Sequence, residues 1–96
     1  MSLAGESNRY TLQYTRKAAR QISEIPQADR QRVRQGIESL AQWPGHQSDV
    51  IKLQGVSEPI FRLRVGRWRV IFLVDADTTS ILVLEVLPRN TAYRGL

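Results

Sequence analysis

Near the start of this chain apolar and polar residues alternate, and after that apolar residues recur at helical spacing. Residues 10–14 alternate, which predicts a short strand. Thr15 is suited to capping a helix that starts directly after it, and Pro26 ends that helix or opens the next segment. The predicted apolar stripe of this first helix consists of Ala18, Ala19, Ile22 and Ile25.

A second helix is predicted over residues 28–42, where apolar residues again recur three or four positions apart. Its stripe consists of Val33, Ile37, Leu40 and Ala41, and Trp43-Pro44-Gly45 is a stop signal. Because the connection between the two helices is short, we expect them to form an antiparallel helical hairpin.

The second half of the chain is rich in residues that favour strands. Residues 61–65, 68–74 and 81–87 are predicted strands, and residues 50–53 are a further candidate for extended structure. The 81–87 run is nearly all apolar, so we expect it inside a sheet, as a central strand. This order predicts an α+β fold: an N-terminal strand, an antiparallel helical hairpin and three antiparallel strands, forming one mainly antiparallel sheet with the helices on one face.

A two-residue turn at Gly66-Arg67 would fix the pairing of the first two long strands. Arg64 would then face Arg69, and a slip of one residue would move every side chain to the other face. The apolar face predicted in this way consists of Phe61, Leu63, Val65, Trp68, Val70 and Phe72. Arg62, Arg64 and Arg69 share the opposite face.

Like charges directly opposite each other destabilise a sheet by some tenths of a kcal/mol to about 1 kcal/mol. Arg64 facing Arg69, with Arg62 diagonal to them, is such an arrangement, and a bound polyanion would remove the penalty. The alternative is that the three arginines only blunt an exposed sheet face and pair with carboxylates such as Asp49 or Glu85. We favour the anion site.

Composition and charge narrow the classes of function. The 96 residues fit a single domain, 1–96, in which we predict disorder for residues 1–8. The chain has no cysteine for disulfides or thiolate metal sites and no apolar run long enough to span a membrane, so we expect it in the cytoplasm. The net charge is +5, and all but two of the 14 cationic residues are arginines, which suit bidentate contacts with phosphate or carboxylate. Nucleic acid is therefore the first partner to consider, and an acidic protein is the second.

Further candidate chemistry follows the last predicted strand, where Arg89, Tyr93 and Arg94 stand close together. Arginines can hold a scissile phosphate and stabilise its transition-state charge, and Tyr93 can orient or deprotonate an attacking hydroxyl or stack on a base. The alternative is a frayed terminal tail. His46, the single histidine, lies in a predicted loop without carboxylates at metal-site spacing, so a solvated loop histidine is expected.

These residues resemble a known family. The sequence FRLRVGRWRVIF at 61–72, the stretch IKLQG at 51–55 and the terminal Arg89…Tyr93-Arg94 are similar to the RelE/ParE superfamily of bacterial type II toxins. The resemblance spans residues 10–94. It implies a compact sheet with a helical hairpin against it, and a toxin that a cognate antitoxin neutralises. We expect the antitoxin to contribute an acidic, partly disordered segment that folds on contact.

RelE-like members of this superfamily cleave mRNA in the ribosomal A site without a metal or other cofactor, through attack of the RNA 2′-hydroxyl on the adjacent phosphate. Carried over position by position, the resemblance matches Arg69 to a phosphate-binding arginine, Arg89 to the catalytic C-terminal arginine and Tyr93 to the tyrosine near the end of the chain. We assign catalytic roles to these three residues. We assign RNA or phosphate binding to Lys52, Arg62, Arg64 and Arg94. The implied partners are an antitoxin, the ribosome and mRNA, and no membrane.

Two other functions remain open. Gyrase-directed ParE members share the fold and often the hairpin but not the nuclease, and Pro88 stands where many RelE-like members carry a histidine. The favoured prediction is therefore a ribosome-dependent mRNA endoribonuclease. The alternatives are an inhibitor that binds DNA gyrase and a non-toxic module that binds RNA or the ribosome.

Overall fold

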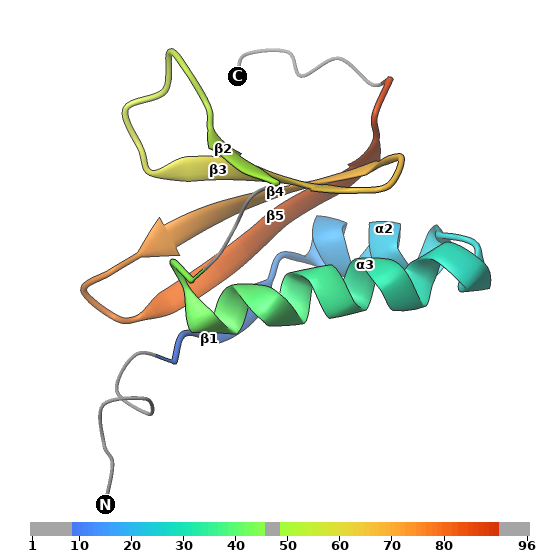
Figure 1. Cartoon of the computed structure of the whole chain (residues 1–96), viewed down its shortest axis with the longest axis horizontal. Helices are drawn as coiled ribbons and strands as arrows, with labels where there is room; N and C mark the ends of the chain where they lie inside the picture. Colours follow the sequence, from blue (N-terminus) through green and yellow to red (C-terminus); the bar gives the residue numbers. More distant parts are fainter. Residues whose placement is uncertain (1–8, 46–48, 91–96) are drawn as a thin grey trace, which may run out of the picture.

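The computed structural model describes residues 9–45 and 49–90, so residues 1–8, where we predict disorder, lie outside it. The elements in chain order are β1 (Thr11–Tyr14), α2 (Arg16–Glu24), α3 (Gln27–Ser39), the 3-10 turn η1 (Leu40–Gln42), β2 (Val50–Lys52), β3 (Ile60–Val65), β4 (Trp68–Asp75) and β5 (Ser80–Pro88). Both helices lie on one face of a single sheet (Figure 1). The predicted α+β class is confirmed.

The sheet has five strands in the order β1-β5-β4-β3-β2, and all neighbours are antiparallel except β1 and β5, which are parallel. The extended segment that starts at Val50 forms an edge strand, which raises the number of strands from the four firmly predicted to five. β5 is an interior strand, as expected, although the middle position belongs to β4. Gly66, at φ +58°, forms the predicted turn between β3 and β4, where Val65 pairs with Trp68 and Arg64 with Arg69.

A β-bulge interrupts the pairing of β4 with β5. Phe72 pairs with Val83 but Ile71 pairs with Glu85, so β5 carries one extra residue at this point. The extra residue reverses the alternation of side chains along β5. Val83 and Val86 are therefore both buried although they are three positions apart.

The core lies between the sheet and the two helices. The helices contribute Ala18, Ile22, Ile25, Val33, Ile37 and Leu40, and the strands contribute Leu63, Val70, Phe72, Val74, Ile81, Val83 and Val86. The apolar face of the hairpin is thus turned to the helices, as predicted. Ala19 differs from the prediction and is exposed, because α2 contacts the core only along a narrow stripe.

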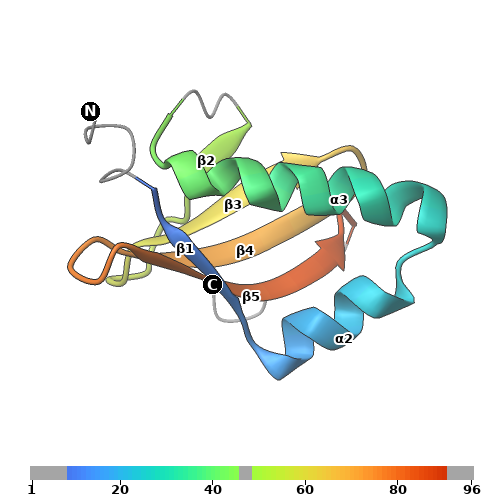
Figure 2. The same ribbon diagram turned by 90° about the horizontal axis from the view of Figure 1, so that it is seen from below.

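Figure 2 shows α2 running beside β5 and α3 returning across the sheet, as expected of a helical hairpin. β1 pairs with only the first four residues of β5, and α2 satisfies part of the remaining edge. The Thr15 hydroxyl donates to the carbonyl oxygen of Leu84 (2.9 Å), and the Gln21 amide oxygen accepts from the backbone N–H of Val86 (2.7 Å). The Thr15 oxygen also accepts from the N–H of Ala18 at 3.0 Å, which confirms the predicted helix cap.

No helix within residues 9–45 and 49–90 has the length and apolar character needed to cross a membrane.

Candidate functional site

Three arginines lie on the sheet face opposite the helices. β3 carries Arg62 and Arg64, β4 carries Arg69, and Arg64 is directly opposite Arg69, as predicted. We call these three residues the arginine face. Because directly opposite residues have Cβ atoms about 4.5–5.5 Å apart, the side chains of Arg64 and Arg69 leave the backbone at neighbouring positions.

Arg62 lies between two isoleucines, Ile51 on β2 and Ile71 on β4. Ile71 is only 1% exposed, and the Nε of Arg62 is buried with no hydrogen-bond partner in the part of the chain that the structure describes. An unsatisfied buried N–H costs about 1–3 kcal/mol. The fold therefore gains no hydrogen bond from the Nε of Arg62 among the described residues.

The other two arginines of this face have partners. Nη2 of Arg64 lies 2.7 Å from Oδ1 of Asp49, and Nη1 of Arg69 donates to two backbone carbonyl oxygens beside the β3–β4 turn, each at 2.9 Å. Pairing with Asp49 was expected in the alternative in which these arginines only blunt the sheet face. This ion pair partly neutralises the arginine face. Glu85 instead pairs with Lys17 at 3.3 Å. Exposed ion pairs contribute about 0–1 kcal/mol, so a phosphate could replace the carboxylate of Asp49 at little loss.

β5 delivers Arg89 to the end of the sheet where the β3–β4 turn lies. The backbone N–H of Arg89 donates to the carbonyl oxygen of Arg67 at 2.7 Å. The exposed Arg89 lines a hollow of about 330 Å³ together with Arg67, Trp68, Pro88 and Asn90. The remaining candidates His46, Tyr93 and Arg94 lie outside the described residues.

Lys52 lies on the other face of the sheet. It pairs with Phe61, whose ring packs against the core, and directly opposite residues share a face. Lys52 is nevertheless exposed, because β2 is a three-residue edge strand. The register of β2 on β3 therefore separates Lys52 from the arginine face with which the sequence analysis grouped it. The connection between these strands is long and irregular, so its length could not reveal this register.

Sequence reasoning missed a cluster beside the β3–β4 turn. Oδ2 of Asp29, in the first turn of α3, accepts from Nε1 of Trp68 at 3.0 Å and lies 3.6 Å from Nε of Arg67. The Arg32 side chain, also on α3, lies so close to Gly66 that an added Cβ there would be 3.2 Å from Nη2. These residues line a second hollow of about 330 Å³. No spacing in the sequence indicates which turn the polar side of a helix will meet.

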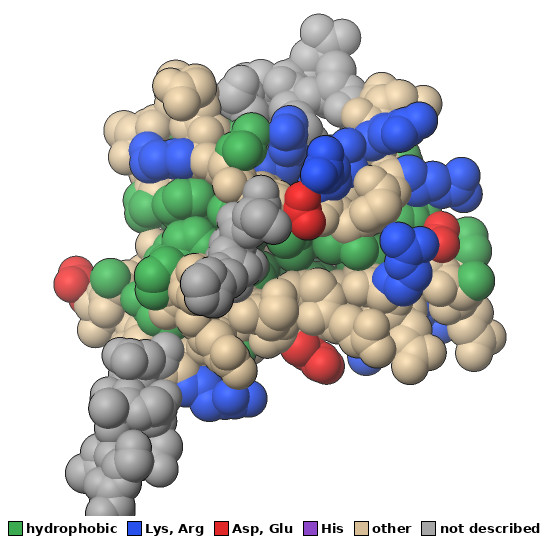
Figure 3. Space-filling model, in the orientation of Figure 1, with side chains coloured by type: hydrophobic (Ala, Val, Ile, Leu, Met, Phe, Trp, Pro, Cys, Tyr) green, Lys and Arg blue, Asp and Glu red, His purple; other side chains and the backbone are tan. Residues whose placement is uncertain are grey.

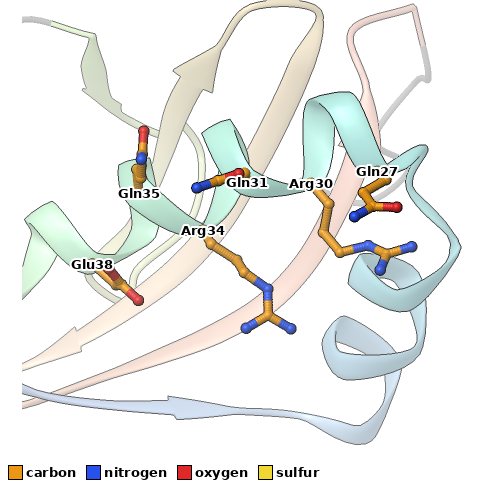
Figure 4. A pocket seen from close by; sticks show the side chains of 6 residues that line it. All are labelled: Gln27, Arg30, Gln31, Arg34, Gln35 and Glu38. Atoms are coloured by element: carbon orange, nitrogen blue, oxygen red, sulfur yellow. The ribbon is translucent and has the colours of Figure 1, made fainter.

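A shallow hollow of about 420 Å³ runs along α3 (Figure 4). It is lined by Gln27, Arg30, Gln31, Arg34, Gln35 and Glu38. Arg30 has a structural role here, because its Nη2 donates to two carbonyl oxygens at the end of α2, at 3.0 and 3.2 Å. Nearby, burial and the Glu38 carboxylate raise the pKa of Tyr14 above its ordinary value of 10.0, and Arg34 opposes them. This hollow lies on the helix side, so it does not join the arginine face.

The arginine face is suited to binding anions and stabilising negative charge. Arginine donates hydrogen bonds in a planar fork but neither accepts them nor exchanges protons at neutral pH. These three side chains alone can therefore bind an anion but cannot accept a proton. Within residues 9–45 and 49–90, no group of three or more His, Cys, Asp or Glu side chains could hold a metal ion.

Comparison with known proteins places this geometry in context. Residues 12–93 match the family model described as ParE toxin of type II toxin–antitoxin system, parDE. A Methanocaldococcus jannaschii protein whose name describes it as a RelE1 toxin is 23% identical over 89 residues, which cover 91% of this chain and 98% of the relative.

Two solved structures are similar in fold. The archaeal RelE–RelB complex of Pyrococcus horikoshii has a TM-score of 0.75 and 28% identity, and the match covers 88% of this chain and 99% of that chain. The isolated E. coli RelE toxin has a TM-score of 0.71 over 86% of this chain and 87% of that chain. Its identity is 14%, so it supports the fold alone.

Proposed function

The chain belongs to the RelE/ParE family of type II toxins, and from that membership we propose that it is a metal-independent, ribosome-dependent mRNA endoribonuclease. The observation that carries this proposal is the incompletely neutralised arginine face. Arg64 stands opposite Arg69, and the buried Nε of Arg62 has no partner among the described residues. A phosphate backbone on this face would relieve the like-charge repulsion and give Arg62 an anion to bind.

In the proposed reaction, the 2′-hydroxyl oxygen of one nucleotide attacks the adjacent phosphorus, and the bond to the departing 5′-oxygen breaks. The products are a 2′,3′-cyclic phosphate and a 5′-hydroxyl, so one proton leaves the attacking hydroxyl and one reaches the leaving oxygen. Arg69 and Arg89 stabilise the added negative charge at the phosphate. Arg62 and Arg64 hold the RNA backbone. Tyr93 orients or deprotonates the attacking hydroxyl, and Arg94 adds an RNA contact.

An antitoxin is the proposed regulatory partner. The solved Pyrococcus horikoshii relative is a complex of RelE with RelB. For this chain we propose a partner with an acidic, partly disordered segment that folds on contact. Its carboxylates would occupy the arginine face, as Asp49 already does at Arg64. The same positive charge would then serve both activity and its inhibition.

Inhibition of DNA gyrase is the second candidate function. It is favoured by the matching family model, which is that of a ParE toxin, and by Pro88 directly before Arg89. In that case the arginines would bind an acidic protein surface, and no RNA bond would break.

Inducible expression in a bacterial host separates the two functions. Primer extension on translated messages should reveal cuts centred on codons soon after induction. Arg89→Ala should abolish these cuts, whereas Arg9→Ala should retain them. Arg9 is the matched control because it is exposed and precedes β1, whose start pairs with Ser80 at the far end of the sheet. Intact messages during growth arrest, together with inhibition of supercoiling by purified protein, would replace the nuclease with the gyrase inhibitor.

A further inference from the structure

Three arginines from three different parts of the chain lie around the tip of the β3–β4 hairpin. Arg67 lies in the turn, Arg32 comes from α3 and Arg89 follows β5. The Arg32 side chain lies against Gly66, and the backbone of Arg89 is hydrogen-bonded to that of Arg67. Figure 3 shows Lys and Arg side chains gathered at this end of the molecule, on the right, where Figure 1 places the β3–β4 turn near the start of α3.

The positive charge of this cluster is not balanced. Asp29 lies 3.6 Å from Nε of Arg67, but the described residues provide no ion pair for Arg32 or Arg89. Three cations and one anion leave a local net charge of +2 (3 − 1). Sequences selected only for stability avoid such a concentration of like charge, because each added arginine repels the others.

An aromatic side chain stands within this charge. Trp68 lines both hollows at the hairpin tip, each of about 330 Å³, which is near the lower end of the size range of small-molecule pockets. The hydrogen bond from Nε1 of Trp68 to Asp29 fixes the orientation of the indole. The indole is partly exposed and otherwise packs against the core. Arginines beside an exposed aromatic surface are typical of proteins that bind single-stranded nucleic acid, where stacking contributes about 1–3 kcal/mol per base.

We propose that this hairpin tip is a second RNA-binding subsite, which holds a nucleotide next to the linkage bound on the arginine face. Arg32, Arg67 and Arg89 contact its phosphates, and its base packs against Trp68. Arg89 continues the arginine face along β5, because Arg69 pairs with Leu87 and Arg89 follows two residues later. Arg32 and Trp68 lie on the helix side of the same hairpin tip, so the nucleotide curves around the tip from one face of the sheet to the other. The proposal rests on the proposed function for the identity of the ligand as RNA, but it requires binding and not cleavage.

Binding of a single-stranded RNA oligonucleotide with 2′-O-methyl groups tests the subsite. These groups block 2′-hydroxyl attack, so the measurement does not depend on catalysis. The emission of Trp68 is followed in a Trp43→Phe protein, where Trp68 is the remaining tryptophan. Trp43 packs against Phe61 and Phe72. The titrations are therefore repeated by anisotropy of labelled RNA with both tryptophans present.

We expect RNA to change the emission of Trp68 and the affinity to fall with salt. Arg32→Ala and Arg67→Ala should each reduce the slope of log affinity against log salt by about 0.7, the value for one lost phosphate contact on a single strand. Arg9→Ala removes the same charge at the other end of the sheet and should leave the slope unchanged.

Equal slopes for Arg32→Ala, Arg67→Ala and Arg9→Ala, or unchanged Trp68 emission at saturating RNA, would overturn the proposal. So would a poly-glutamate peptide that binds more tightly than RNA and loses affinity in the same two variants, because the ligand would then be an acidic protein. If the oligonucleotide binds as expected while translated messages stay intact, the subsite stands and the nuclease proposal fails. If messages are cleaved but the three variants have equal slopes, the nuclease proposal stands and the subsite proposal fails.

Discussion

Replacing Arg62 by methionine should make the protein more stable and less toxic at the same time. Its buried Nε has no partner in the described part of the chain, and an unsatisfied buried N–H costs about 1–3 kcal/mol. Its cross-strand neighbours are Ile51 and Ile71, so a flexible methionine can pack against apolar side chains. Arg62 is only partly buried, so we expect the lower end of that range, a gain of about 1 kcal/mol. For a domain of this size, the gain corresponds to an increase of about 4–8 °C in Tm.

Urea unfolding followed by tryptophan fluorescence measures the gain, as a higher midpoint at an unchanged m value. Growth arrest on induction should weaken in the same variant, because in the proposed function Arg62 holds the RNA backbone. Arg62→Lys keeps the charge but lacks the buried Nε–H. It should therefore retain part of the gain in stability and regain part of the toxicity. Arg64→Met is the control: it removes an exposed ion pair with Asp49, so no gain in stability is expected. Lower stability of Arg62→Met would refute the reasoning, because the guanidinium would then be stabilising the fold.

Three further outcomes follow from local geometry. Thr15→Ala should lower the free energy of unfolding in urea by about 1 kcal/mol or more, because the hydroxyl caps α2 and also bonds to β5. Gly36→Ala would stabilise an isolated helix by about 1 kcal/mol but should here lower the Tm, because the new Cβ would lie 2.8 Å from Cγ2 of Val65. The raised pKa of Tyr14 contributes stability that is present below the ordinary value of 10.0 and is lost as the pH rises through the raised pKa. Glu38→Gln should lower this pKa in an ultraviolet titration that uses Tyr14→Phe as the blank.

The hairpin was predictable because local rules determine it. A two-residue turn with glycine at its first position fixes which residues pair, and alternation then sorts apolar from charged side chains. Arg64 facing Arg69 follows from these two rules alone, and the structure agrees. The cap at Thr15 is equally local.

Features that depend on distant segments were not predictable. The sheet face of Lys52 depends on how an irregular connection sets the register of β2. The contact between Arg32 and Gly66 depends on where α3 crosses the sheet, and the pair of Asp29 with Arg67 depends on the same crossing. Helical periodicity identifies the buried side of α3 but does not specify which turn its polar side meets.

The bulge in β5 has a consequence for the end of the chain. The single additional residue shifts the alternation of side chains by one position. Every later residue of β5 therefore points to the opposite face of the sheet from the one it would face in an uninterrupted strand. Deleting one residue there would turn Arg89 through half a rotation while leaving the net charge unchanged. Any transplant of this terminus between relatives must therefore preserve the count of residues between the bulge and the arginine, because the presence of the arginine alone does not determine where its charge is delivered.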